Sequence, residues 1–326
     1  MPKYLPLLLF IFLLTQGLKG NCAKSRPIGG ITFTNILPDP DPPPYGDFQT
    51  LIVPIKKAGN LIIVEAQVDS VEGNFVMDTG APYLVLNATY FRDAPKIDDQ
   101  ESAGINGESG GSFTTVVHNF SILDLHYSSL TADVTDLSAI ENGRNMKILG
   151  LLGTRLFANF AVTIDLFNNL MYIHKLDEQG NIPPGEQVFH DPFLRTPFNY
   201  MNDIIFMKGA IADKTLWFVF DTGAETNLLD YSRSGKAIRK MQIINRSKLT
   251  GVGGSSFEIL YARFDELTVG NQKFTRNRAL VTDLEKMGRA YDHNIDGILG
   301  YDFFSRGIFT INFVKKEFEM YIYNNQ

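Results

Sequence analysis

The chain has 326 residues, of which 44% are hydrophobic and 20% charged, and its formal net charge is −6 at pH 7. This balance is ordinary for a soluble globular protein and argues against disorder outside the ends, and the acidic charge disfavours nucleic acid as a partner. The length suits two compact units of about 100 to 150 residues each.

Residues 1–20 have the layout of an export signal. Lys3 precedes an apolar run from Leu5 to Leu14, and small and polar residues follow as far as Gly20. The run is too short to span a bilayer, which takes about 20 apolar residues. We therefore expect an exported chain, which is periplasmic, secreted or lipid-anchored at a membrane surface. A buried N-terminal strand or helix is the alternative.

The only cysteine, Cys22, lies just beyond this signal, so the chain cannot form an internal disulfide. Cys22 is a candidate lipid attachment site, although Lys19 and Asn21 stand where a lipoprotein signal has small residues. The alternative is a signal that is cleaved elsewhere and leaves an idle thiol.

Residues 21–47 are rich in proline, which lacks the backbone donor that helices and sheets need, so this segment is predicted to be an extended tether. An N-terminal lobe is expected over residues 48–176 and a C-terminal lobe over residues 196–326. The segment 177–195 between them contains Gly180 and several prolines and is predicted to be a linker.

Short β-branched and apolar runs recur along both lobes and are predicted to be strands. They stand at residues 51–55, 61–68, 75–77, 160–164, 204–207, 216–220, 309–313 and 318–323. A helix is expected over residues 231–244, where Ile238, Met241 and Ile244 are spaced by three. Many short strands with few helical patterns indicate an all-β class of barrel or sandwich type.

The sequence contains a long internal repeat. Phe75-Val76-Met77-Asp78-Thr79-Gly80-Ala81 returns as Phe218-Val219-Phe220-Asp221-Thr222-Gly223-Ala224, and further blocks match in the same order. These blocks start at Gly104 and Gly251, Asp133 and Leu280, Gly150 and Gly297, and Val162 and Phe309. A repeat this long indicates a duplicated lobe rather than a solenoid.

Each Asp-Thr-Gly follows an apolar strand, so Asp78 and Asp221 are expected on tight turns at strand ends. A pseudo-twofold axis would bring the two carboxyls together, with one ionised and the other protonated. The ionised carboxylate can take a proton from water while the neutral acid donates a proton to a carbonyl oxygen. The pattern therefore predicts general acid–base hydrolysis.

These motifs resemble the aspartic peptidases of the retropepsin-like kind, with two copies of the subunit fused in one chain. The resemblance covers residues from about 48 to the C-terminus. It implies an all-β, two-lobed fold of tandem barrels related by a pseudo-twofold axis, and a monomer that acts as an internal pseudo-dimer. Asp78 and Asp221 are then the catalytic pair, and Thr79 and Thr222 form a mutual brace between the loops that Gly80 and Gly223 complete.

Two further motifs gain a role from this resemblance. Leu151-Leu152-Gly153 and Ile298-Leu299-Gly300 are apolar pairs followed by glycine, which in this family pack across the active-site loops and support them. The glycine-rich stretches that contain Gly104 and Gly107, and Gly251 and Gly253, stand where the flap hairpins are expected. Exposed turns are the alternative for both stretches.

Ala81 and Ala224 stand where pepsin-like enzymes usually have a serine or threonine. Because a hydroxyl donor is missing beside each carboxylate, its charged form is less favoured, and a working pH closer to neutral than that of pepsin is expected. The two copies also differ after the alanine, with Pro82 in one and Glu225 in the other, so the cleft is expected to be asymmetric.

The sequence favours an exported aspartic endopeptidase that binds an extended peptide or protein between its lobes. The five histidines show no ligand spacing, so neither a metal nor another cofactor is expected. One alternative is a peptide-binding protein that keeps the fold without turnover. Another is a processing enzyme that cuts itself or one partner.

Overall fold

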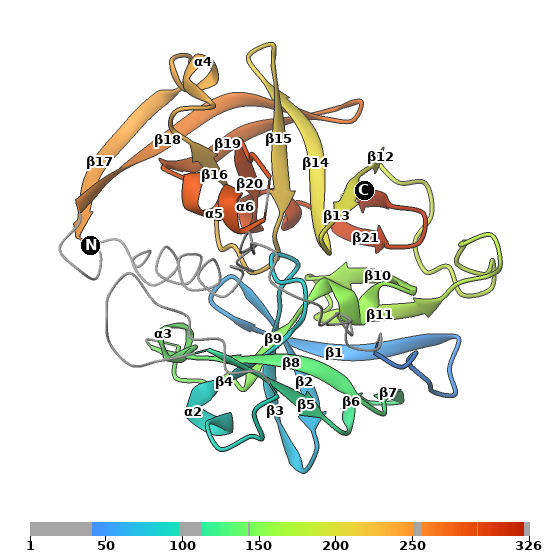
Figure 1. Ribbon diagram of the computed structural model, residues 1–326. Helices are drawn as coiled ribbons and strands as arrows, with labels where there is room; N and C mark the ends of the chain where they lie inside the picture. Colours follow the sequence, from blue (N-terminus) through green and yellow to red (C-terminus); the bar gives the residue numbers. More distant parts are fainter. Residues whose placement is uncertain (1–40, 98–111, 143, 251–255, 292, 323–326) are drawn as a thin grey trace, which may run out of the picture.

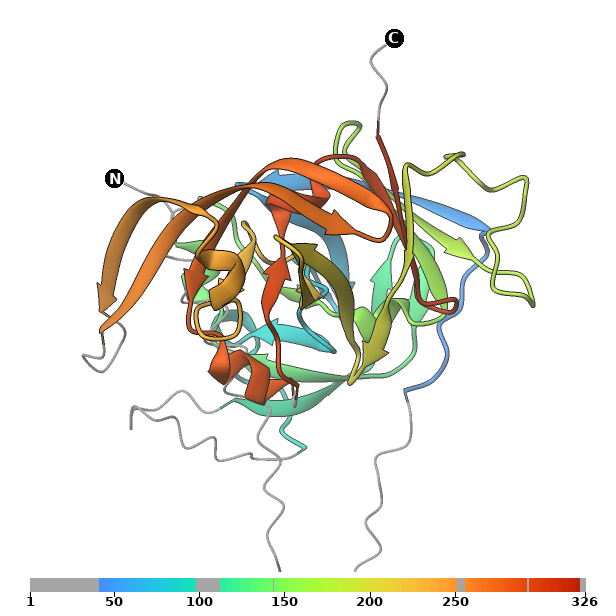
Figure 2. The same ribbon diagram turned by 90° about the horizontal axis from the view of Figure 1, so that it is seen from above.

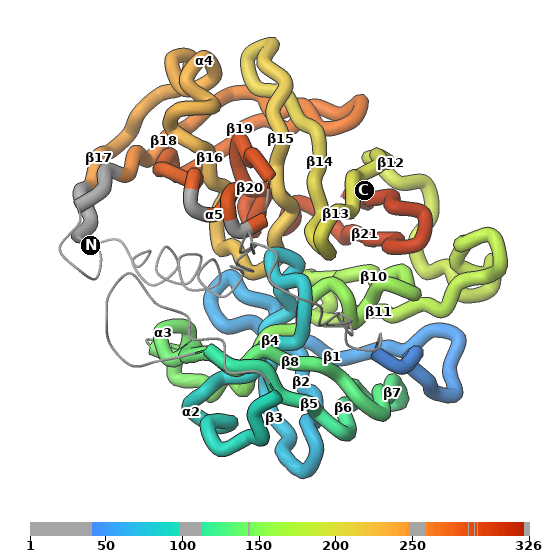
Figure 3. Tube along the Cα trace, viewed as in Figure 1, coloured from blue at the N-terminus to red at the C-terminus, as the bar shows by residue number. Residues whose placement is uncertain are grey.

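The computed structural model describes residues 41–97, 112–142, 144–250, 256–291 and 293–322. Two β lobes lie one above the other, the N-terminal lobe in blue to green and the C-terminal lobe in yellow to red (Figure 1). Residues 176–193, which contain neither helix nor strand, connect them on the side where the lobes share strands (Figure 3). The mainly β, two-lobed architecture expected from the sequence is confirmed.

The described N-terminal lobe consists of short strands and three single-turn helices. Its strands are β1 (Thr50–Ala58), β2 (Leu61–Val68), β3 (Val71–Met77), β4 (Leu84–Asn87), β5 (Phe113–Val117), β6 (Phe120–Ile122), β7 (Leu125–Tyr127), β8 (Leu130–Thr135), β9 (Gly150–Leu152), β10 (Phe160–Asp165) and β11 (Leu170–Lys175). Its helices are α2 (Ala88–Phe91), α3 (Ser138–Glu141) and the 3-10 turn η1 (Thr154–Phe157).

The C-terminal lobe repeats this plan with longer strands at one edge. Its strands are β12 (Leu194–Pro197), β13 (Asn199–Met201), β14 (Ile204–Ile211), β15 (Lys214–Phe220), β16 (Leu228–Asp230), β17 (Gln242–Thr250), β18 (Ser256–Val269), β19 (Gln272–Thr282), β20 (Gly297–Leu299), β21 (Ile308–Asn312) and β22 (Glu317–Tyr321). Its helices are α4 (Gly235–Ile238), α5 (Glu285–Ala290) and α6 (Tyr301–Phe304). Seen from above, β17 and β18 form a long curved ribbon that extends past the rest of the lobe (Figure 2).

The helix expected over residues 231–244 is wrong for most of its length. Only α4 is helical there, and β17 begins at Gln242. Ile243 pairs with Ala262 of β18, because the long neighbouring strand offers the β-branched residues a ladder of hydrogen bonds.

Within the described ranges, no helix is long and apolar enough to cross a membrane.

The two lobes share a sheet in which equivalent strands lie symmetrically on either side of a centre. Across the interface the strand order is β12-β22-β21-β10-β11-β1, with β10 and β21 as the central pair, and the sheet continues from β1 into β2 and β3 of the N-terminal lobe. In that pair Thr163 lies opposite Thr310, its counterpart in the repeat, and their hydroxyl oxygens are 2.8 Å apart. The pseudo-twofold axis therefore passes between these two threonines.

The aromatic core fixes the strand that leads to Asp221. Phe220 is fully buried and contacts the rings of Phe309 and Phe318, with centroids 5.6 Å and 5.0 Å away. Burying a phenylalanine side chain contributes about 1.5 to 3 kcal/mol. The end of β15 is thus held on the shared sheet, which belongs to both lobes.

The described end of the proline-rich segment lies against the N-terminal lobe. The carboxylate of Asp41 accepts a hydrogen bond from the backbone N–H of Thr131 at 3.0 Å, and Tyr45 forms a β-bridge with His126. The rings of Tyr45 and His126 also stack, with centroids 5.4 Å apart. At least residues 41–45 therefore pack on the lobe instead of extending freely from it.

Candidate active site

Two buried strands end at the catalytic aspartates predicted from the sequence. β3 pairs in parallel with β9, and β15 pairs in parallel with β20. The backbone N–H of Asp78 continues the first ladder by donating to the carbonyl of Leu152 at 3.0 Å. That of Asp221 donates to the carbonyl of Leu299 at the same distance. Each aspartate is thus anchored by its own lobe's Leu-Gly motif.

The glycines of those motifs allow the supporting strand to approach the loop closely. A Cβ atom on Gly153 would lie 2.2 Å from the carbonyl oxygen of Tyr83, and one on Gly300 would lie 2.4 Å from that of Thr226. Tyr83 and Thr226 both come shortly after an Asp-Thr-Gly-Ala run. Only glycine fits where the backbone must pass this near to another backbone.

The two threonines join the loops through a reciprocal set of hydrogen bonds. The hydroxyl of Thr79 donates to the carbonyl of Phe220 at 2.8 Å and accepts from the N–H of Thr222 at 3.0 Å. The hydroxyl of Thr222 donates to the carbonyl of Met77 at 2.7 Å and accepts from the N–H of Thr79 at 3.0 Å. Both threonines are fully buried, so the structure places them in the mutual brace that the resemblance implied.

Each Asp-Thr-Gly glycine faces the aspartate of the opposite lobe. A Cβ atom on Gly80 would lie 2.7 Å from the carboxyl carbon of Asp221, and one on Gly223 would lie 2.7 Å from that of Asp78. The missing side chains therefore create the space in which the two carboxyls meet. The structure thus brings together the six predicted residues of the two loops.

Both carboxyls are nearly removed from water, since Asp78 is 0% exposed and Asp221 is 4% exposed. Burial, followed by the charge of Asp221, raises the pKa of Asp78 well above its usual range, and burial also raises the pKa of Asp221. Each loop amide opposes this rise, because Gly80 N–H donates to Oδ1 of Asp78 at 2.9 Å and Gly223 N–H donates to Oδ1 of Asp221 at 2.8 Å. Two carboxyls that interact this directly titrate as a pair.

The second oxygen of Asp78, Oδ2, takes no hydrogen bond from its own loop amide, which donates to Oδ1 instead. It is buried, and no amide or hydroxyl in the described part of the chain donates to it, so the carboxyl of Asp221 is the group with which it can share a proton. A buried carboxyl oxygen without a partner is costly unless it carries a proton or meets a ligand. The site is therefore suited to hold one proton at Asp78 and to receive a polar group there.

Residues that the sequence did not single out also connect the lobes at this site. The hydroxyl of Tyr291 donates to the carbonyl of Gly80 at 3.1 Å, and Arg144 forms an ion pair with Glu225 beside the second loop. Arg144 and Tyr291 occupy equivalent positions in the repeat, each following its lobe's short helix. The two residue types differ and no motif marks them, so a comparison of the repeats in the sequence does not single them out.

The candidate flap glycines lie outside the described residues. Gly104 and Gly107 fall in the segment between α2 and β5, and Gly251 and Gly253 fall between β17 and β18. The described strands β17 and β18 pair along their length up to this second segment. The flap assignment stays a prediction.

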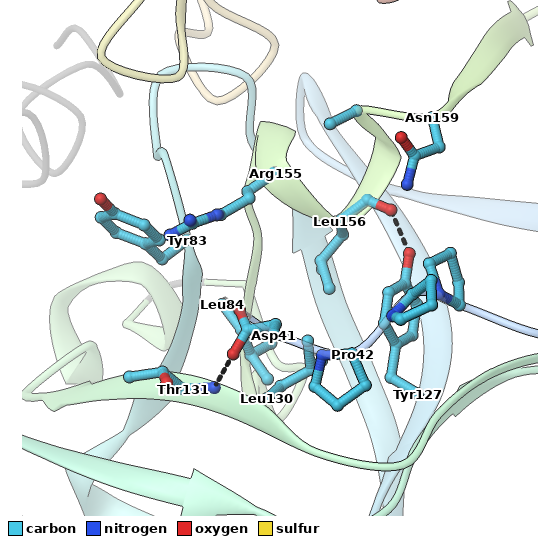
Figure 4. A pocket seen from close by; sticks show the side chains of 13 residues that line it. Asp41, Pro42, Tyr83, Leu84, Tyr127, Leu130, Thr131, Arg155, Leu156 and Asn159 are labelled. Carbon is cyan, nitrogen blue, oxygen red and sulfur yellow. Dashed lines mark hydrogen bonds between the residues drawn. The ribbon is translucent and has the colours of Figure 1, made fainter. Parts of the chain in front are cut away.

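A pocket of about 160 Å³ lies beside the first loop, and neither Asp78 nor Asp221 lines it (Figure 4). Its wall contains Tyr83, on whose ring Arg155 stacks at 5.2 Å, and the segment from Asp41 to Pro44. The segment that precedes the first lobe therefore forms part of the wall of this pocket. Among the residues that the structure describes, no group of three or more His, Cys, Asp or Glu side chains is placed to hold a metal ion.

Comparison with known proteins agrees with the duplicated site. A family model described as aspartyl protease matches residues 64–156 and again 207–303, and each matched region contains one Asp-Thr-Gly loop. None of the curated proteins compared matches the chain. A solved structure, the crystal structure of Basic 7S globulin from soybean, is similar over 84% of this chain and 95% of that chain, with 10% identity and a TM-score of 0.45.

Proposed function

The chain belongs to the aspartyl protease family, and from this premise we propose that it is an exported aspartic endopeptidase whose dyad is Asp78 and Asp221. One observation carries the proposal: each aspartate packs against the loop glycine of the opposite lobe, so two buried carboxyls share one site. A protein that only binds peptides does not need two carboxyls in direct interaction.

The two aspartates divide the chemistry according to their surroundings. Asp78 is fully buried and its pKa is raised further than that of Asp221, so it holds the shared proton, while Asp221 is the ionised base. Asp221 takes a proton from a water molecule as the water oxygen attacks the carbonyl carbon of the peptide, and Asp78 gives its proton to the carbonyl oxygen. The product of this step is a neutral tetrahedral diol.

The second step returns the dyad to its starting state. Asp221 passes the proton it has received to the amide nitrogen, and the C–N bond breaks. Asp78 takes a proton back from one hydroxyl of the diol, which becomes the new carboxyl group. The cycle consumes one water molecule and one peptide bond, and it needs no metal and no covalent intermediate.

The substrate is an extended peptide that lies across the interface between the lobes. An extended peptide can add its backbone to strand edges near the site, which supplies affinity with little dependence on sequence. Because the residues around the two loops differ, as at Pro82 and Glu225, we propose that the two sides of the cleft select different side chains.

The dyad is tested by comparing the mature wild-type chain with the variants Asp78→Asn and Asp221→Asn. Each is incubated with a mixed peptide library from about pH 3 to pH 8, and cleavage is followed by mass spectrometry. We expect both variants to lose cleavage. Asp124→Asn, which changes an exposed carboxylate in a turn of the first lobe, is the control and keeps it.

Cleavage that persists in either dyad variant would show that the two aspartates do not act together. Peptide binding without cleavage by the wild-type chain would instead favour a binding protein with the same fold.

We also propose that the chain is exported, because of its basic and apolar N-terminal residues. Expression of the full chain in a secreting host, followed by N-terminal sequencing of the product, locates the cleavage site. An intact Met1 on a protein that stays inside the cell would refute export. A Cys22→Ser variant that leaves the membrane fraction would show that Cys22 carries a lipid, whereas an unchanged distribution would exclude it.

A further inference from the structure

Tyr291 connects the core of the C-terminal lobe to the active-site loop of the other lobe. It follows α5, is only 6% exposed, and packs with Phe206, Val219 and Ala224. Its hydroxyl donates to the carbonyl of Gly80 at 3.1 Å. The backbone at its other end is also held, because the amide of Asn202 donates to the carbonyl of Tyr291 at 3.3 Å.

Gly80 is the residue through which this bond reaches the dyad. Its N–H donates to Oδ1 of Asp78 at 2.9 Å, and its Cα lies directly against the carboxyl of Asp221. One residue therefore contacts both aspartates, while its carbonyl is held by Tyr291. Any shift of this carbonyl moves the surface on which the two carboxyls meet.

We propose that Tyr291 is a positioning residue, whose hydroxyl holds Gly80 from the opposite lobe and thereby fixes the placement of Asp78 relative to Asp221. The inference rests on the proposed function, since it assigns a role within the same site. Tyr291 itself transfers no proton in the reaction.

Among the described residues, a tyrosine hydroxyl holds the first loop but not the second. Arg144, the counterpart of Tyr291 in the repeat, bonds the side chain of Glu225 and the carbonyl of Ile140. In the described residues, no side chain donates to the carbonyl of Gly223 as Tyr291 does to that of Gly80. The two loops are consequently held by different chemistry, and the asymmetry falls on the loop that carries the more deeply buried aspartate.

The surroundings keep the phenol protonated while the dyad titrates. Burial, and then the charges of Asp221 and Asp78, raise the pKa of Tyr291 well above its usual value. The other charged or titratable groups of these elements are the Arg144–Glu225 pair next to the second loop, the imidazole of His293 two residues after Tyr291, and the exposed Glu285–Arg289 pair on α5.

The test compares Tyr291→Phe with Tyr127→Phe as a matched control. Tyr127 is also buried, at 4% exposed, and its hydroxyl also donates to a backbone carbonyl, that of Leu156, but within one lobe. Loss of one buried hydrogen bond corresponds to roughly a tenfold change in an equilibrium or rate. We expect Tyr291→Phe to lower kcat about tenfold with little change in KM.

The pH profile distinguishes positioning from simple support of the fold. A looser first loop separates the carboxyls and admits water, and both changes lower the upper apparent pKa of the dyad. The basic limb of kcat/KM therefore moves to lower pH in Tyr291→Phe. Tyr127→Phe reduces at most the amount of folded enzyme, which leaves the profile in place.

A second measurement does not depend on activity. The aspartate carboxyl carbons are labelled with ¹³C and titrated by NMR in the wild-type chain and in both tyrosine variants, with Asp78→Asn and Asp221→Asn used to assign the signals. The proposal predicts that the dyad titration shifts in Tyr291→Phe alone. An identical titration in Tyr291→Phe, Tyr127→Phe and wild type would overturn it. If the wild-type chain cleaves no peptide, the proposed function fails, and the titration still decides the role of Tyr291.

Discussion

Arg144 of the N-terminal lobe donates through Nη2 to Oε1 of Glu225 in the C-terminal lobe, directly after the second Asp-Thr-Gly-Ala loop. The two side chains are only 11% and 18% exposed. Asn60, in the turn between β1 and β2, adds a bond from its side-chain amide to the carbonyl of Glu225 at 3.0 Å. The first lobe therefore contacts the loop that carries Asp221 through two separate side chains.

Breaking this ion pair should destabilise the protein strongly. Glu225→Gln leaves the guanidinium buried without a countercharge, which typically costs about 3 to 5 kcal/mol. Replacing both partners with methionine removes both charges and should recover much of that loss. Urea unfolding of Arg144→Met, Glu225→Met and the double methionine variant measures the coupling free energy.

The exposed pair Lys56–Glu65 is the control for this cycle. Its side chains are 51% and 57% exposed although the charged atoms are 2.5 Å apart, so its removal should change stability by less than about 1 kcal/mol. Equal effects at the two pairs would contradict the buried, cross-lobe role of Arg144 and Glu225.

The loop glycines should tolerate no side chain. In Gly80→Ala and Gly223→Ala the new methyl group would lie within 2.7 Å of the opposite carboxyl carbon, which forces the dyad apart. A displacement of about 1 Å can lower a rate by about 100-fold, so kcat/KM should fall at least that far in both variants. Gly185→Ala, where a Cβ meets nothing within 4 Å, should keep wild-type kinetics. Activity in Gly80→Ala near the wild-type level would refute the close packing.

The duplicated motif predicted much of the site because its signals are local. Asp78-Thr79-Gly80 and Asp221-Thr222-Gly223 follow apolar strands, and two copies of one strand and turn related by a twofold axis meet at the same point. The strands could also be predicted from the sequence, because their signals are local as well. β2 and β14, for instance, are runs of β-branched and apolar residues bounded by turns.

Contacts between the lobes could not be predicted from the sequence in this way. Tyr291 and Gly80 are 211 positions apart, and Arg144 and Glu225 are 81 apart. Tyrosine in one copy and arginine in the other leave no residue match for a repeat comparison to detect. The helix expected over residues 231–244 was wrong because spacing by three does not exclude a strand when a long partner such as β18 is available.

The buried dyad should make the pH dependence of activity bell-shaped, with an optimum nearer to neutral than pH 2. Activity requires one proton on the pair, so it falls as the pH drops below the lower apparent pKa and as it rises above the upper one. Because burial and the charge of Asp221 raise the pKa of Asp78 well above its usual range, the basic limb lies above ordinary carboxyl values. A profile of kcat/KM with its optimum near pH 2 would contradict this.

The same pKa shift should make the dyad a source of instability at neutral pH. A carboxyl whose pKa is raised by folding stabilises the protein at low pH, and this contribution is lost as the pH rises through the folded-state pKa. Asp78→Asn should therefore raise the melting temperature at pH 7 and have a smaller effect at pH 4. Asp93→Asn, which changes an exposed carboxylate, serves as the control and should show no such difference.

Protonation of His174 should change the stability of the protein in the opposite sense to that of Asp78. His174 lies in β11, next to the central pair of the shared sheet. It is 1% exposed, with Nδ1 at 2.9 Å from the hydroxyl of Thr50 and Nε2 at 3.2 Å from that of Thr163. Burial lowers the pKa of His174 from 6.5 to about 4, although the charge of Glu186 opposes the change. The folded protein therefore keeps this imidazole neutral where the unfolded chain protonates it.

Between pH 6.5 and about 4 the unfolded chain binds a proton at His174 that the folded protein does not bind. Above pH 6.5 the imidazole is neutral in both states and this stability is fully present; it is lost as the pH falls from 6.5 to about 4, by about 3 kcal/mol in total. His174→Gln offers an amide to both threonines and does not titrate, so its free energy of unfolding should change less between pH 7 and about pH 4.5. His118→Gln, at an exposed position, should follow the wild type. Parallel losses of stability in all three proteins would show that His174 makes no measurable contribution to the pH dependence of folding.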